Sequence, residues 1–161
     1  MSVSRVVLIA GALLLATQAA TAAVSCRVSG GSVMFGSYDP LTPVPTDTTA
    51  TLAVRCEARG NGGIVVMNVA IGPGSNGTSV SNRRMRHAGA SGDYLSYGLF
   101  RDAGRSAVWG QSFLIDTVTQ LVAVPDNRSV PINFTIYGRL TALQDVNVGD
   151  YVDSVQVTVS P

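Results

Sequence analysis

Apolar residues recur at every second position in several short segments of this chain, and that period constrains the fold more than any other feature. The clearest run is Val130, Ile132, Phe134 and Ile136, with Pro, Asn and Thr between them. Side chains of an extended strand point alternately to the two faces of a sheet, so this spacing is typical of a half-buried β-strand. The chain is therefore expected to build its core from strands.

Other segments repeat this alternation or form short apolar runs bounded by Gly, Pro, Asn and Asp. The predicted strands are residues 33–35, 49–56, 64–71, 95–99, 119–124, 130–136 and 155–159. Helices are disfavoured because Lys, a good helix former, is absent and Glu occurs once: all 11 basic residues are Arg and nine of the ten acidic ones are Asp. We predict an all-β fold, an immunoglobulin-like antiparallel β-sandwich formed as one domain.

The first 22 residues have the plan of a secretory signal peptide. Arg5 precedes an apolar run, Val6 to Ala16, which is followed by the small tripeptide Ala20 to Ala22. The alternative, an N-terminal membrane anchor, is disfavoured because the run is shorter than the roughly 20 residues that span a bilayer. We predict residues 1–22 as the signal peptide, with cleavage after Ala22, and residues 23–161 as the exported domain.

The two cysteines, Cys26 and Cys56, both lie in strand-like sequence and would meet an oxidising compartment after export. An even pair of cysteines normally forms a disulfide there, so we predict a Cys26–Cys56 bond; two buried free thiols are the alternative. Two cysteines and one histidine do not suggest a metal site.

Composition and motifs favour no catalysis and no cofactor. Residues 72–77 match G-x-G-x-x-G, but the Thr, Ser, Val and Asn that follow are poor helix formers, so we predict a Gly-rich hairpin loop rather than a dinucleotide site. His87 is the only histidine, and no G-x-S-x-G motif accompanies it. A net charge of +1 gives no reason to expect nucleic acid. We predict that the protein is not an enzyme.

An arginine cluster occupies residues 83–86. Contact with an acidic surface or a sugar acid is one interpretation. We favour an exposed turn whose arginine side chains cover apolar surface.

The order of short motifs along the chain is more specific than any one of them. The motifs are Cys26-Arg27-Val28, residues 33–39 (VMFGSYD), the strand ending at Cys56, residues 83–85, 95–102 (LSYGLFRD), Trp109-Gly110, 136–140 (IYGRL) and 149–153 (GDYVD). In this order they resemble the spore coat protein U domain, the subunit family of archaic chaperone-usher pili. The resemblance extends over nearly all of residues 23–161.

The resemblance implies a bacterial pilus subunit or adhesin, exported to the periplasm and carried to the cell surface or secreted. Its expected partners are a periplasmic pilus chaperone, an outer-membrane usher and neighbouring pilin subunits. Its fold would be a sandwich that lacks the final strand, leaving a groove that a donated strand fills. The residues mapped to the border of that groove are Val33, Phe35, Val155, Val157 and Val159.

Two features depart from the family pattern. Members commonly end on an aromatic residue, whereas this sequence ends Val159-Ser160-Pro161. Strand-donating subunits also carry an alternating apolar extension before the first cysteine, where only residues 23–25 follow the predicted cleavage site. We therefore expect a tip subunit that accepts a strand and donates none. A free secreted adhesin that binds a surface or carbohydrate receptor, or a coat protein, is the alternative function, and an exported hydrolase is a third.

Overall fold

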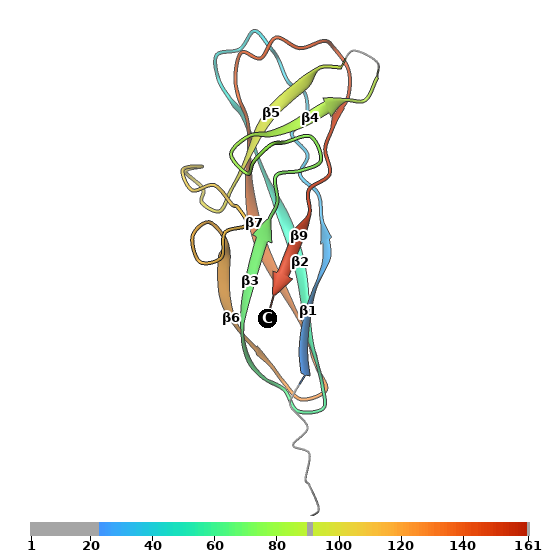
Figure 1. Cartoon of the computed structure of the whole chain (residues 1–161), viewed down its shortest axis with the longest axis vertical. Helices are drawn as coiled ribbons and strands as arrows, with labels where there is room; N and C mark the ends of the chain where they lie inside the picture. Colours follow the sequence, from blue (N-terminus) through green and yellow to red (C-terminus); the bar gives the residue numbers. More distant parts are fainter. Residues whose placement is uncertain (1–22, 90–91, 161) are drawn as a thin grey trace, which may run out of the picture.

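The computed structural model describes residues 23–89 and 92–160, and in this part of the chain it has nine strands and no helix (Figure 1). The strands are β1 (Ala23–Gly31), β2 (Thr46–Arg59), β3 (Gly63–Ile71), β4 (Arg83–His87), β5 (Tyr94–Phe100), β6 (Val118–Val124), β7 (Ser129–Leu140), β8 (Tyr151–Val152) and β9 (Val157–Ser160). The predicted signal peptide, residues 1–22, lies outside the described residues. No helix within the described ranges is long and apolar enough to cross a membrane.

The strands form two antiparallel sheets with a shared core. The larger sheet has the order β1-β2-β7-β5-β4-β8 and the smaller one β6-β3-β9. Fully buried side chains from both sheets meet between them, among them Leu52, Val54, Met67, Val69 and Trp109. The predicted all-β, antiparallel sandwich is confirmed.

The long β2–β7 ladder forms the centre of the larger sheet (Figure 1). It runs from Thr46 opposite Leu140 to Glu57 opposite Ser129. Along β7 every second residue from Ile132 to Leu140 is buried, as the period-two pattern in the sequence predicts. The residues between these positions face away from the core and are mostly polar, which is the division expected of a half-solvated sheet.

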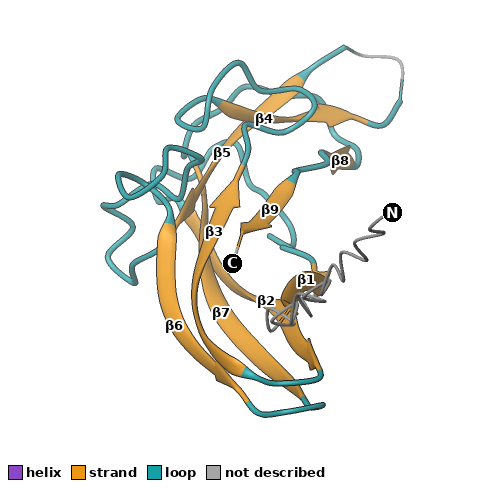
Figure 2. Ribbon diagram, turned by 60° about the horizontal axis from the view of Figure 1, so that its bottom comes forward, coloured by secondary structure: helices purple, strands orange, loops and turns teal. Residues whose placement is uncertain are grey.

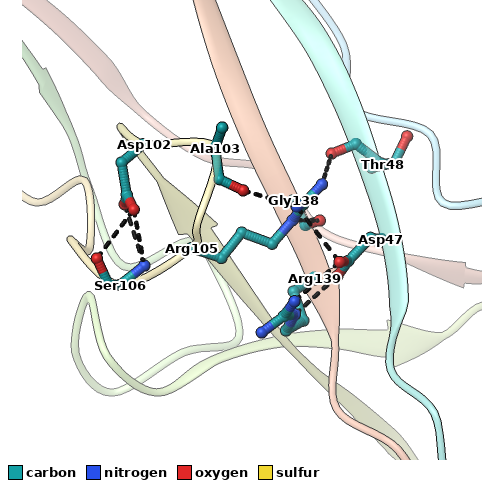
Figure 3. A network of polar contacts seen from close by, with 8 residues as sticks. All are labelled: Asp47, Thr48, Asp102, Ala103, Arg105, Ser106, Gly138 and Arg139. Carbon is teal, nitrogen blue, oxygen red and sulfur yellow. Dashed lines mark hydrogen bonds and ion pairs between the residues drawn. The ribbon is translucent and has the colours of Figure 1, made fainter.

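A polar network on the outside of this ladder holds the segment after β5 against it (Figure 3). Arg139 donates to both carboxylate oxygens of Asp47, at 2.7 and 2.8 Å, and these bonds hold the pKa of Asp47 below its usual range. Arg105 pairs with the same carboxylate at 3.3 Å and donates to the carbonyls of Thr48 and Gly138. The loop that carries Arg105 is thus attached to both β2 and β7.

Three local predictions were wrong. Residues 33–35 are not a strand: although Val33 and Phe35 point inward and Met34 is exposed, no strand in the described part of the chain pairs with this segment. The arginine cluster is not an exposed turn but strand β4, which pairs with β5 and β8. Residues 72–77 are not a hairpin loop either, because they connect β3 in the smaller sheet to β4 in the larger one.

The predicted disulfide is confirmed. Cys26 of β1 and Cys56 of β2 are directly opposite in the ladder, with their Cα atoms 4.0 Å apart, and they form the bond. Cys56 is fully buried against Met67 of the other sheet. The bond therefore ties the outermost strand of the larger sheet to the core.

Replacing both cysteines by alanine is expected to lower the free energy of unfolding by about 3 to 4 kcal/mol, because a closed loop of 30 residues restricts the unfolded chain. Urea denaturation of the wild-type and double-variant proteins measures the difference. Alkylation provides the control: two reactive thiols in the native, non-reduced wild-type protein would contradict the bond.

Candidate functional site: a groove between two sheet edges

The two sheets end side by side without joining. β1 is the edge of the larger sheet and β9 the edge of the smaller one, and the two strands lie close to each other (Figure 2). β1 pairs with β2 and β9 pairs with β3, whereas no ladder joins β1 to β9 in the described part of the chain. Each strand therefore has one edge whose backbone groups have no neighbouring strand.

A large open cavity of about 1240 Å³ lies along these edges. One wall comes from the end of β1, at Val28 and Gly31, and from the segment after it, residues 32–38 and 40. The other comes from residues 146–155, which precede β9, and from Val157 at its start. The floor consists of apolar side chains from both sheets: Leu52, Ile71, Met85, Leu95, Leu99, Ile136 and Leu140. The groove thus lies directly over the hydrophobic core, and all of these floor side chains except the half-buried Met85 are buried.

The structure brings four of the five predicted groove residues together. Val33, Phe35, Val155 and Val157 line the cavity, two from each wall. Val159 lies outside its lining, opposite Val69 in the β3–β9 ladder, and packs against the core. The resemblance to the family mapped these positions to the border of the groove, although residues 33–35 form no strand.

The position of the Phe35 ring depends on a glycine of β7. Its ring lies over Gly138 of β7, where a Cβ atom would come within 2.9 Å of the ring. The ring is also 5.9 Å from that of Tyr97, measured between centroids. The wall that follows β1 is therefore anchored to the sheet by an aromatic side chain rather than by strand pairing.

The opposite wall is anchored by a polar cluster that sequence reasoning missed, formed by Asp153, Tyr97, Ser75 and Asn76. The Tyr97 hydroxyl donates to one carboxylate oxygen of Asp153 at 2.6 Å. The other oxygen accepts from the backbone N–H groups of Ser75 and Asn76 and from the Asn76 side chain, at 3.0 to 3.3 Å. Burial, and next the bond to Asp153, raise the pKa of Tyr97 far above its usual range.

Arg83 lies beneath the same loop and is fully buried. Its guanidinium donates four bonds, all to main-chain carbonyls: those of Ile71 and Trp109 at 2.7 Å, Gly72 at 2.8 Å and Val80 at 2.9 Å. Burial lowers the pKa of Arg83. The spacing of the arginine cluster gave no sign of this role, because it depends on how the loop before β4 and the segment at Trp109 fold around the side chain.

The motifs that could have suggested catalysis or cofactor binding do not form a reactive site. The Nε2 atom of His87 lies 3.2 Å from the carbonyl oxygen of Val148, and its Nδ1 atom accepts from the N–H of Gly89. The G-x-G-x-x-G segment leads into strand β4 rather than into a helix. Within residues 23–89 and 92–160, no group of His, Cys, Asp and Glu could hold a metal ion.

The described part of the chain is thus an all-β sandwich with a disulfide at one edge and a groove between two strand edges. Residues 11–158 match the Spore Coat Protein U domain, and the chain belongs to this family. Membership places it among non-enzymatic structural proteins, as the sequence predicted. Together with the disulfide, it indicates an extracytoplasmic location.

Two known proteins are similar to this chain. Protein U of Myxococcus xanthus is 31% identical over 144 residues, which is 85% of this chain and 75% of that protein. The crystal structure of the CsuC–CsuE chaperone–tip adhesion subunit pre-assembly complex, from archaic chaperone-usher Csu pili of Acinetobacter baumannii, matches with a TM-score of 0.54. That match is 19% identical and covers 85% of this chain but only 39% of that chain, so it is a likeness of fold.

The burial of Arg83 leads to a stability prediction. Arg83→Met would leave four carbonyls without this donor, three of them in buried bonds, and we expect it to lower the free energy of unfolding by more than about 3 kcal/mol. Arg84→Met is the matched control, because Arg84 is half-buried, stacks on Tyr94 and donates to one carbonyl only, that of Asn76 at 3.3 Å; its cost should be about 1 kcal/mol. Urea denaturation compares them, and equal losses would contradict the role given to Arg83.

Proposed function

We propose that this domain is a structural or adhesive subunit of a chaperone-usher pilus and that it accepts a β-strand from a partner in the groove between β1 and β9. The observation that carries the proposal is the coincidence of two unpaired strand edges with an open groove whose walls and floor are lined by apolar side chains. A strand inserted there would hydrogen-bond to β1 on one side and to β9 on the other, which requires the two strands to separate from their present contact to about 9.6 Å. It would complete the sandwich.

The chemistry of the groove favours a strand of alternating apolar residues. Every second side chain of such a strand would point to the floor and cover Leu52, Leu95 and Leu99. Burying four or five aliphatic side chains contributes roughly 6 to 15 kcal/mol before the costs of ordering and association. Main-chain bonds to both edges would add specificity for an extended segment.

An empty groove of this kind also requires protection. Free strand edges beside apolar surface are a site of aggregation, so a subunit in transit needs its groove covered. We infer a periplasmic chaperone as the first occupant, an outer-membrane usher as the route to the surface, and neighbouring subunits as the final donors. Family membership supports this, as does the fold likeness to a chaperone–tip adhesion subunit complex.

We further infer a position at the tip of the fibre. Residues 24–28 pair with β2 inside their own sheet, so they are engaged and not free to be donated. N-terminal sequencing of the exported protein is expected to begin at Ala23, and immunogold labelling to mark fibre ends. A mature N-terminus well upstream of Ala20, or label along the shaft, would contradict the tip position.

A coat protein is the second candidate, favoured by the 31% identity to Protein U over most of both chains. In that role the domain would not depend on a donated strand. The two functions therefore differ in one respect. A pilus subunit needs a strand from a partner to complete its sandwich, whereas a coat protein would be complete as an isolated domain.

A C-terminal strand extension tests this difference. We would append Asn-Gly, which favours a tight hairpin turn, and ten residues alternating Val and Thr, which span about 33 Å when extended. If the added strand raises the free energy of unfolding by about 3 kcal/mol, the melting temperature should rise by roughly 10 °C.

The control extension has Ser in place of every Val and should leave the melting temperature unchanged. If the Val/Thr extension also has no effect, the sandwich is already complete and the strand-accepting function is wrong.

A further inference from the structure

The Asp153 cluster lies in a wall of the groove, and its geometry points to a role beyond local stability. We propose that Asp153 is a positioning residue that keeps the empty groove open, by holding the wall before β9 away from the wall after β1. This inference rests on the proposed strand-accepting function. It adds a residue that governs how readily the groove receives a strand.

The cluster joins three parts of the molecule. Tyr97 belongs to β5 in the larger sheet, Ser75 and Asn76 to the loop after β3, and Asp153 to the segment between β8 and β9. Both Asp153 and Tyr97 line the groove. A single carboxylate therefore fixes the position of one wall relative to both sheets.

The far part of this wall is attached elsewhere, through Asn147 to Asp93, Val148 to His87 and Asp150 to the N–H of Ala88. Nearer β9, which has only four residues, the wall is held to the β3 side by the N–H of Gly72, which donates to the Gln156 carbonyl, and by the N–H and hydroxyl of Ser75, which both donate to the Ser154 carbonyl, at 2.9 to 3.1 Å. β8 has two residues, paired with the end of β4. Asp153 lies between these two short ladders, where residues 153–156 have no regular structure.

An empty apolar groove tends to close. Val33 and Phe35 on one wall and Val155 and Val157 on the other would lose water-exposed area if the walls moved together. That attraction has no directional preference, whereas the four bonds to Asp153 require a defined geometry. The cluster therefore opposes closure while the groove has no strand in it.

The surrounding sequence fits this role. Gly74 has a φ of +88°, and a Cβ atom there would collide with the Asp153 carboxylate. Only glycine lets the loop approach this closely. The negative charge of Asp153 also attracts the buried guanidinium of Arg83, which is bound to Gly72 in the same loop.

The test separates the rate of strand entry from the rate of strand release. The probe is a fluorescent ten-residue Val/Thr peptide with a lysine at each end, mixed with the purified exported chain and its variants in a stopped-flow instrument. If Asp153→Ala lets the walls close, only a minor fraction of the molecules has an open groove. The observed association rate then falls in proportion to that fraction. We expect association at least tenfold slower and dissociation changed less than twofold, because an inserted strand holds the walls apart.

Two further variants make the result specific. Tyr97→Phe removes one hydroxyl, should also slow association, and replaces Asp153→Ala if that variant does not fold. Asp102→Ala is the matched control: Asp102 accepts bonds from the N–H groups of Ser106 and Ala107 in an exposed turn, and it does not line the groove. Its association rate should equal that of wild type.

The outcomes are distinct. If the wild-type chain binds no peptide, the strand-accepting function itself fails. If wild type binds and Asp153→Ala associates as fast as Asp102→Ala, the positioning role is wrong. Equal changes in association and dissociation would show that Asp153 acts only on stability, which also overturns the proposal.

Discussion

The structure depends on how its two sheets end beside each other. They share a core, but in the described part of the chain no ladder joins the edge strand β1 of one sheet to the edge strand β9 of the other. β1 and β9 end the two sheets next to each other, each with a free edge, above a floor of leucine and isoleucine side chains. In the proposed function a further strand would lie over this floor. We propose that the features around the groove keep the sandwich folded until that strand is supplied.

The two walls are held by different means. On the β1 side, the Cys26–Cys56 disulfide ties the edge strand to β2, and the Phe35 ring packs over Gly138. On the β9 side, where pairing is short, hydrogen bonds to the Asp153 carboxylate hold the wall. One wall is thus held by a covalent bond and aromatic packing, and the other by directional polar contacts.

Sequence reasoning succeeded where the determinant is local. Alternation along 130–136 predicted a strand because each residue's face follows from its neighbours, and the cysteines paired as expected for an exported chain. It failed where the determinant is the path of a loop or a distant partner. Arg83 is buried because the irregular segment before β4 and the Trp109 carbonyl surround it, and the role of Asp153 depends on loop 72–77, which is far away in the sequence. Residues 33–35 have the strand pattern but no strand beside them, since pairing is also non-local.

Amide hydrogen exchange on β1 and β9 tests the incomplete sandwich most directly. In the chain alone, amides on the free edges of both strands should exchange rapidly, while those in the β2–β7 ladder stay protected. With the alternating Val/Thr strand appended, the same β1 and β9 amides should become protected together. Two results would contradict the account. One is that the β1 and β9 amides of the chain alone are as protected as those of the β2–β7 ladder, and the other is that the appended strand does not increase their protection.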